Sequence, residues 1–162
     1  MTTQFEHCIG RLRDGISLNI EQAYDACIAL FNEEIDHDNI VLLLQLLANK
    51  GESTDEILGF IKAMRERMTP ITFDQQHIVD ICGTGGSLPN RFNVSTCAAM
   101  VMGALGFYVA KHGNRGSKKA NGSFDFLDAM GIPYDLSADD HQYRLNNYGV
   151  TFLFARTYHK AV

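Results

Sequence analysis

The chain has 162 residues and a formal net charge of −5, with 46% hydrophobic and 20% charged residues. This length allows one substantial core, or a small helical domain joined to part of another, and the composition is ordinary for a globular protein. The acidic balance argues against a general nucleic-acid binder, and no apolar run approaches the length of a membrane span. The first residues carry no secretory signal pattern, so we expect a cytoplasmic protein.

The first part of the chain reads as four helices with short connections. The predicted segments are Thr3 to Arg13, Ile20 to Glu34, a run capped by Asp38 and ending at Lys50, and Thr54 to Met68. The third contains IVLLLQLLANK, which is apolar nearly all round and therefore predicts a buried helix. We expect a small helical bundle over residues 1–70.

The fourth helix has the clearest start signal. Ser53 and Glu56 have the spacing of a capping box, in which each side chain bonds the backbone N–H of the other residue. Pro70 ends the segment because proline cannot continue a helix. One face of this helix is apolar and carries Ile57, Leu58, Ile61 and Met64.

After Pro70 short β-rich runs alternate with helical ones. The predicted strands are His77 to Ile81, Phe107 to Lys111 and Thr151 to Ala155. The predicted helices are Ser95 to Leu105, Ser123 to Met130 and a segment that Ser137 and Asp140 cap and that runs to Tyr148. Such alternation predicts a parallel sheet covered on both faces. The expected fold class is α/β, with an N-terminal helical bundle followed by an incomplete parallel-sheet α/β domain over residues 71–162.

Residues 80–96, DICGTGGSLPNRFNVST, place a glycine-rich loop between a predicted strand and a predicted helix. Glycines let backbone N–H groups approach a ligand, and the N-terminus of a helix favours an anion. A second glycine-rich loop, KHGNRGSKKANG, follows the next strand, and no Asp or Glu occurs from Ser87 to Phe124. Because parallel strands end at one edge of a sheet, the two loops predict a diphosphate site there. The alternative is that the glycines serve only tight turns.

Cysteine and histidine give no metal signal in the sequence. Cys8, Cys27, Cys82 and Cys97 form no CxxC pair and have no ligand-like spacing with histidine, so we interpret them as reduced and mostly buried. The dispersed histidines are expected to lie at the surface or to cap helices. They are His7, His37, His77 and His141.

Several short motifs resemble anthranilate phosphoribosyltransferase. They are GTGG at 83–86, NVST at 93–96, KHGNR at 111–115, GS at 122–123 and FLFA at 152–155. The N-terminal segments RDGISLNIEQA and KGESTDEILGFIKAM are also similar to that family, so the resemblance covers nearly the whole chain. The family shares its architecture with the nucleoside phosphorylases.

The resemblance implies transfer of phosphoribosyl from phosphoribosyl pyrophosphate to the anthranilate amine in tryptophan biosynthesis, with Mg²⁺ and with a homodimer formed through the helical domain. It implies neither a nucleic-acid partner nor a membrane partner, and no covalent nucleophile, so no catalytic residue is assigned. Ser95 is the expected magnesium contact. The implied substrate-binding residues are Gly83, Thr84, Gly85, Gly86, Asn93, Val94, Ser95, Thr96, Lys111, His112, Gly113, Asn114, Arg115, Ser123 and His159.

The chain also departs from the family. Ser87 stands where the family usually has a carboxylate, and Lys118 and Lys119 stand where it has a serine pair. Family members are about twice as long, and the other half carries the acidic magnesium pair. We therefore expect this chain alone to be inactive. The alternatives are a noncatalytic binding or assembly module with the same fold, and a nucleoside phosphorylase relative.

Overall fold

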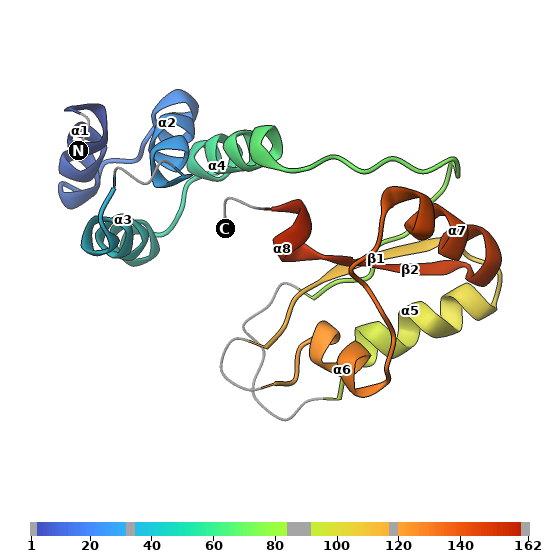
Figure 1. Cartoon of the computed structure of the whole chain (residues 1–162). Coiled ribbons are helices and arrows are strands. Elements are labelled where there is room, and N and C mark those ends of the chain that lie inside the picture. The colour runs from blue at the N-terminus through green and yellow to red at the C-terminus, as the bar shows by residue number, and fades with distance from the viewer. Residues whose placement is uncertain (1–2, 32–34, 84–91, 117–119, 160–162) are drawn as a thin grey trace. The chain divides into compact units, whose positions relative to one another are not determined.

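The computed structural model describes residues 3–31, 35–83, 92–116 and 120–159 (Figure 1). The chain forms two compact units, one built from the helices of Met1–Met68 and the other spanning Thr69–Tyr158. None of the helices in the described ranges is long and apolar enough to cross a membrane.

The first unit is the predicted bundle of four helices. They are α1 (Thr3–Arg13), α2 (Ile20–Phe31), α3 (His37–Lys50) and α4 (Thr54–Arg67). The core is assembled from one stripe of each of the first three helices and includes Phe5, Cys8, Leu12, Ala23 and Leu43. Helices α2 and α4 approach closely at Gly59, where an added Cβ would lie 2.5 Å from the carbonyl oxygen of Ile20. A small residue is therefore required where these helices meet.

Two details of α3 differ from the prediction. Its N-cap is Asp36, whose carboxylate accepts from the backbone N–H of Asn39 at 2.9 Å, and Asp38 lies inside the first turn. The apolar run is buried on one stripe only, because Leu43 and Leu47 are buried whereas Leu44 is 48% exposed. Acidic residues two positions apart offer equivalent capping chemistry, so the backbone entry into the helix decides which one caps.

The apolar face of α4 lies outward. Ile57, Leu58 and Ile61 are 49%, 41% and 45% exposed, whereas Gly59 and Ala63 lie on the buried face. The helix therefore packs through its small residues, which allow close approach to α2, rather than through its large apolar ones.

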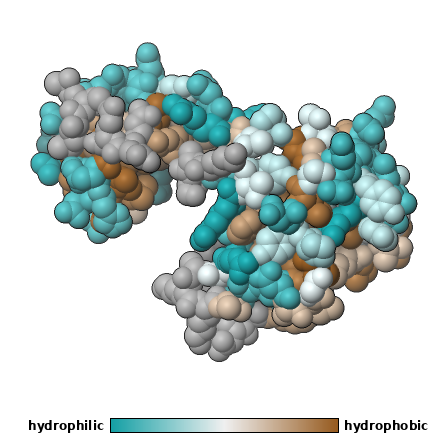
Figure 2. Space-filling model, in the orientation of Figure 1, coloured by the Kyte–Doolittle hydropathy of each residue, from teal (hydrophilic) through white to brown (hydrophobic). Residues whose placement is uncertain are grey.

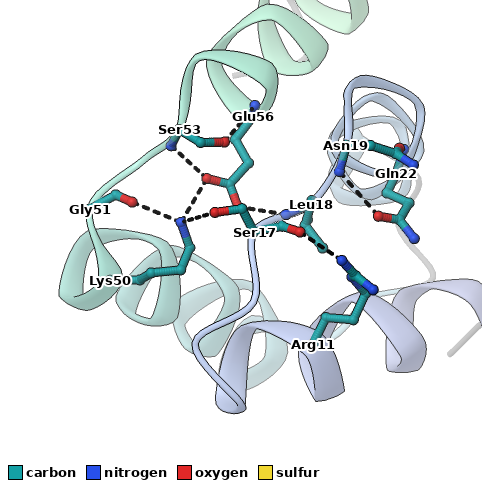
Figure 3. Close-up of polar contacts among 9 residues, drawn as sticks. All are labelled: Arg11, Ser17, Leu18, Asn19, Gln22, Lys50, Gly51, Ser53 and Glu56. Carbon is teal, nitrogen blue, oxygen red and sulfur yellow. Dashed lines mark hydrogen bonds and ion pairs between the residues drawn. The ribbon is translucent and has the colours of Figure 1, made fainter.

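Glu56 is the centre of a buried polar network in the first unit (Figure 3). The predicted capping box with Ser53 is present. The carboxylate also accepts from the backbone N–H of Leu18 at 2.9 Å and pairs with the ammonium of Lys50 at 2.8 Å. Because Glu56 is only 1% exposed, these contacts replace the water that a buried carboxylate needs. One side chain thus joins the start of α4, the end of α3 and the segment before α2.

The second unit contains a pair of parallel strands, β1 (Val109–Gly113) and β2 (Val150–Phe154), with Val109 opposite Val150. The helices of this unit are α5 (Val94–Ala104), α6 (Ser123–Ala129), α7 (Ala138–Tyr148) and α8 (Ala155–Tyr158). The predicted strand His77 to Ile81 is reduced to one parallel bridge, between Val79 and Val109. The short helix α8 was not predicted. The expected architecture, a helical unit followed by a small parallel α/β unit, is confirmed.

The strands of the second unit have a helix on each face. Phe152 joins Ala99 of α5 and Val109 in one core, whereas Thr151 points to the opposite face and bonds the His141 ring of α7 at 2.7 Å. The expectation of a surface or capping role for His141 was wrong, since its side chain is buried. Apolar surface appears in the region of α5 (Figure 2), where Val101 and Leu105 are exposed.

Candidate anion-binding site

The start of α5 offers hydrogen-bond donors, and no acidic side chain in its first turn accepts from them. Asn93 is the N-cap residue but makes no side-chain cap bond, and the first turn contains no Asp or Glu. The hydroxyl of Thr96 is fully buried, and its Oγ1 has no hydrogen-bond partner within the described ranges. A helix N-terminus carries a positive partial charge and unsatisfied N–H groups. This end of α5 is therefore suited to an anion.

Lys111 brings a positive charge to β1 and is only 2% exposed. Its ammonium donates to the carbonyl oxygen of His112 at 3.1 Å, and the described part of the chain gives it no ion pair. Burial lowers the pKa of Lys111, and the neighbouring Asp80 and Cys82 offset part of that effect. A buried cation without a direct counter-ion is costly unless an anion joins it.

The loop after β1 lies against the start of α6. The Ser123 hydroxyl donates to the carbonyl oxygen of Asn114 at 3.2 Å. A Cβ added at Gly113 would lie 2.1 Å from that hydroxyl oxygen, so only glycine allows this approach. The Asn93 side chain donates to the carbonyl oxygen of Gly122 at 3.5 Å. The three predicted segments around Asn93, Lys111 and Ser123 therefore converge at one place.

Asp125 organises this loop and was missed by the sequence reasoning. Its carboxylate accepts from the backbone N–H groups of Gly116 and Gly122, both at 2.8 Å. An acidic residue at the third helical position, Asp125 after the N-cap Gly122, was the available signal. The carboxylate holds the loop in shape by bonding backbone donors.

Arg115 does not point its charge at the start of α5. Its guanidinium pairs with Asp128 at 2.8 Å and donates to the hydroxyl of Tyr134. Burial lowers the pKa of Arg115, and Asp128 together with Tyr134 raises it by more, so the net shift is upward. Arg115 thus connects the loop after β1 to the end of α6. Its charge is not directed at the place where the segments around Asn93, Lys111 and Ser123 meet.

Several predicted site residues are not placed with this group. The predicted residues Thr84, Gly85 and Gly86 lie outside the described residues, and so do Ser87, Lys118 and Lys119, which depart from the family pattern. His159 groups with the first unit, so it is not placed relative to the site. Val94 has a 66% exposed side chain, and its contribution would come from the backbone. Gly83, Ser95 and His112 are among the described residues. Ser95 and His112 lie in the segments around Asn93 and Lys111, and Gly83 lies just before the part of the glycine loop that is not described.

The start of α5 and the strand β1 do not by themselves supply the ligands of a magnesium ion. Mg²⁺ prefers carboxylate oxygens and substrate phosphates in near-octahedral geometry. The stretch from Phe92 to Gly116 contains no carboxylate, and Ser95 offers one neutral hydroxyl.

A different cluster lies at the edge of the sheet. The carboxylate of Asp80, the thiol of Cys82 and the imidazole of His112 have ligand atoms within 4.8 Å of one another. The prediction of mostly buried cysteines holds for Cys8 and Cys27 but is wrong for Cys82, which is exposed. Sequence spacing did not reveal the cluster, because the strand pairing brings the two segments together.

Comparisons with known proteins agree with this architecture. Residues 75–162 match the family described as glycosyl transferase family, a/b domain, and residues 6–68 match its helical bundle domain. The chain belongs to this glycosyl transferase family.

Curated relatives of the chain include anthranilate phosphoribosyltransferases. The protein of that name from Geobacillus stearothermophilus is 41% identical over 154 residues, which are 95% of this chain and 45% of the relative. The protein from Geobacillus sp. (strain WCH70) is 38% identical over 158 residues, which are 98% of this chain and 46% of the relative. The chain thus spans about half the length of these curated relatives.

Solved structures of anthranilate phosphoribosyltransferases are also similar to this chain. The crystal structure of anthranilate phosphoribosyltransferase from Thermus thermophilus matches with a TM-score of 0.83 and 36% identity, covering 95% of this chain and 47% of that one. The Saccharomyces cerevisiae enzyme, solved in complex with PRPP and Mg, matches with a TM-score of 0.82 and covers 99% of this chain and 49% of that one. At 21% identity the yeast likeness shows the fold alone.

Proposed function

We propose that the second unit binds the diphosphate of phosphoribosyl pyrophosphate between the start of α5 and the end of β1. The observation that carries the proposal is the buried ammonium of Lys111, which is 2% exposed and lacks a direct carboxylate partner within the described ranges. The unpartnered hydroxyl of Thr96 and the acid-free first turn of α5 add support from a second element. The site would be part of an anthranilate phosphoribosyltransferase.

The chemistry of that enzyme suits these residues. The anthranilate amine attacks the anomeric carbon of the ribose, pyrophosphate leaves with the electron pair of the broken C–O bond, and the amine nitrogen releases one proton. Such a reaction depends on positioning and on neutralising the departing charge. Lys111 would hold the diphosphate, and the Asn93 to Thr96 segment would donate to it from the helix start. We propose that this chain alone binds the substrate without transferring the phosphoribosyl group, because the relatives that it matches are about twice its length.

Replacing Lys111 with methionine is expected to weaken binding of phosphoribosyl pyrophosphate by roughly 10- to 100-fold, since a hydrogen bond to a charged group contributes about 1.5–3 kcal/mol. Methionine fills a similar volume without a buried charge, so we expect the variant to fold. Isothermal titration calorimetry measures the dissociation constant. The matched control is Lys62→Met on the exposed surface of α4, which should leave binding unchanged.

Equal binding by the wild type and Lys111→Met would contradict the diphosphate site. Absence of binding by the wild type would favour the noncatalytic module. Anthranilate fluorescence in the presence of phosphoribosyl pyrophosphate should stay constant with the chain alone.

We infer that the outer face of α4 is the homodimer surface of the helical unit. Ile57, Leu58 and Ile61 form an exposed apolar strip that is typical of an interaction surface. Introducing a charge there, as Ile61→Glu, should convert a dimer to a monomer in sedimentation velocity, whereas Lys62→Glu on the neighbouring position should not. A monomeric wild type, or a dimer that survives Ile61→Glu, would contradict this surface.

A further inference from the structure

The cluster of Asp80, Cys82 and His112 arises from the strand register. Val79 bridges Val109, with the Val79 N–H donating to Tyr108 at 2.9 Å and the Ala110 N–H donating to Val79 at 3.1 Å. This bridge is isolated, and beyond it the His112 N–H donates to the Asp80 carboxylate at 3.1 Å, while the Cys82 thiol lies within 4.8 Å of both side chains. Alternate residues of a strand point to opposite faces, so the His112 and Lys111 side chains point to opposite faces of β1. The cluster therefore uses side chains other than Lys111, although Asp80 and Cys82 are near enough to offset part of the effect by which burial lowers the pKa of Lys111.

The three side chains have nearly the separation that a bound metal ion imposes. Tetrahedral ligands at about 2.0–2.3 Å from a zinc ion lie roughly 3.3–3.8 Å from one another. The His112 Nδ1 and the Asp80 Oδ2 are 3.8 Å apart, and the thiol of Cys82 lies within 4.8 Å of both ligand atoms. A shift of the exposed thiol by about 1 Å would complete this geometry.

The carboxylate of Asp80 is already oriented. Its Oδ1 accepts from the backbone N–H of His112 at 3.1 Å, which turns the second oxygen, Oδ2, toward the imidazole. Hydrogen bonds of this kind fix the direction of ligands at metal sites. The Asp80 and His112 side chains are 41% and 44% exposed, so an ion could enter from solvent.

The ligand set selects the kind of ion. A thiolate with an imidazole and a carboxylate suits zinc and its first-row neighbours, whereas Mg²⁺ takes oxygen ligands. We propose that Asp80, Cys82 and His112 form a site for a divalent transition-metal ion, with zinc as the best match. Binding would displace the thiol proton of Cys82 to solvent and leave the fourth position to water. This site goes beyond the proposed function, because it takes a cation and is formed by Asp80, Cys82 and His112 rather than by Lys111.

Cobalt reports on this site because a thiolate bound to Co²⁺ gives a charge-transfer absorption band. Titrating the full 162-residue chain with Co²⁺ should produce that band and saturate at one equivalent, and Zn²⁺ should then remove it. Cys82→Ser should abolish the band. His112→Gln and Asp80→Asn should each weaken binding at least about tenfold, as loss of metal-site groups generally does.

Matched controls keep the test specific. Cys97→Ser and His77→Gln change the same residue types outside the cluster and should leave the titration unchanged. Far-ultraviolet circular dichroism of each metal-free variant shows whether the fold is kept, and the exposure of these side chains leads us to expect that it is. Lys111→Met should tighten cobalt binding by removing a nearby positive charge while weakening diphosphate binding. A wild type without the thiolate band, or a band that persists in Cys82→Ser, would overturn the proposal.

Discussion

Glu56→Ala is expected to destabilise the first unit by roughly 3–5 kcal/mol, the cost typical of breaking a buried ion pair from one side. The substitution would leave the backbone N–H of Leu18 buried without its acceptor and would remove the partner of the Lys50 ammonium. It would also remove half of the capping box with Ser53. Three separate elements lose their connection at once (Figure 3), so the loss should far exceed that of an ordinary helix-cap substitution.

Urea unfolding followed by circular dichroism measures this change, and amide hydrogen exchange at Leu18 localises it. The control is Asp55→Ala, which removes an exposed carboxylate from the same helical turn and should change stability by less than about 1 kcal/mol. A Glu56→Ala loss as small as that of the control would show that the network contributes little.

The same network predicts a dependence on pH. Burial raises the pKa of Glu56, but Lys50 and the donors of Ser53 and Leu18 lower it by more, so its net shift is downward. A carboxyl with a lowered folded-state pKa stabilises the protein above its unfolded value, about 4.3, and this contribution is lost as the pH falls further. Glu56→Gln should therefore lose less stability than the wild type on acidification.

Gly149→Ala is expected to destabilise the second unit by about 2–5 kcal/mol, through backbone strain and crowding together. Gly149 ends α7 with φ of 69°, in the left-handed region that side chains disfavour. An added Cβ would also lie 2.6 Å from the carbonyl oxygen of Gly103 and 2.9 Å from that of Phe107. Both neighbours are backbone atoms, which cannot turn aside as a flexible side chain can.

Gly131→Ala separates the two causes. Gly131 has φ of 66°, but an added Cβ would meet nothing within 4 Å, so only the strain of about 1–2 kcal/mol remains. The difference between the two variants in urea unfolding measures the crowding at Gly149. Hydrogen exchange of the Val109 amide, which donates to Gly149, should rise in Gly149→Ala alone. Equal losses for the two variants would contradict the crowding argument.

Gly149 bears on the candidate site because it lies where α7 ends, and its carbonyl oxygen accepts from the Val109 N–H of β1 at 2.8 Å. The strand that carries Lys111 is thus anchored at its start by the turn after α7. A shift there would move the cation relative to the start of α5, so we regard this turn as support for the site.

The sequence by itself determined the features that depend on neighbouring residues. The capping boxes at Ser53 with Glu56 and at Ser137 with Asp140 are present as predicted, because three-residue spacing brings these groups together within one helical turn. The order of helices and strands followed from the change in hydrophobic period after Pro70. The family resemblance followed from the motifs, because each motif is a short run of consecutive residues in a glycine-rich loop or at the start of a helix.

The tertiary structure alone decided what depends on distant segments. Local pattern could not tell that α4 packs through Gly59, or that the guanidinium of Arg115 pairs with Asp128, because these choices depend on which helix lies opposite. Asp80 and His112 are 32 positions apart and meet only because Val79 bridges Val109 in parallel register. A shift of one residue in that bridge would move Asp80 and Cys82 along the chain away from His112. Strand pairing therefore created the candidate metal cluster, and no spacing in the sequence encodes it.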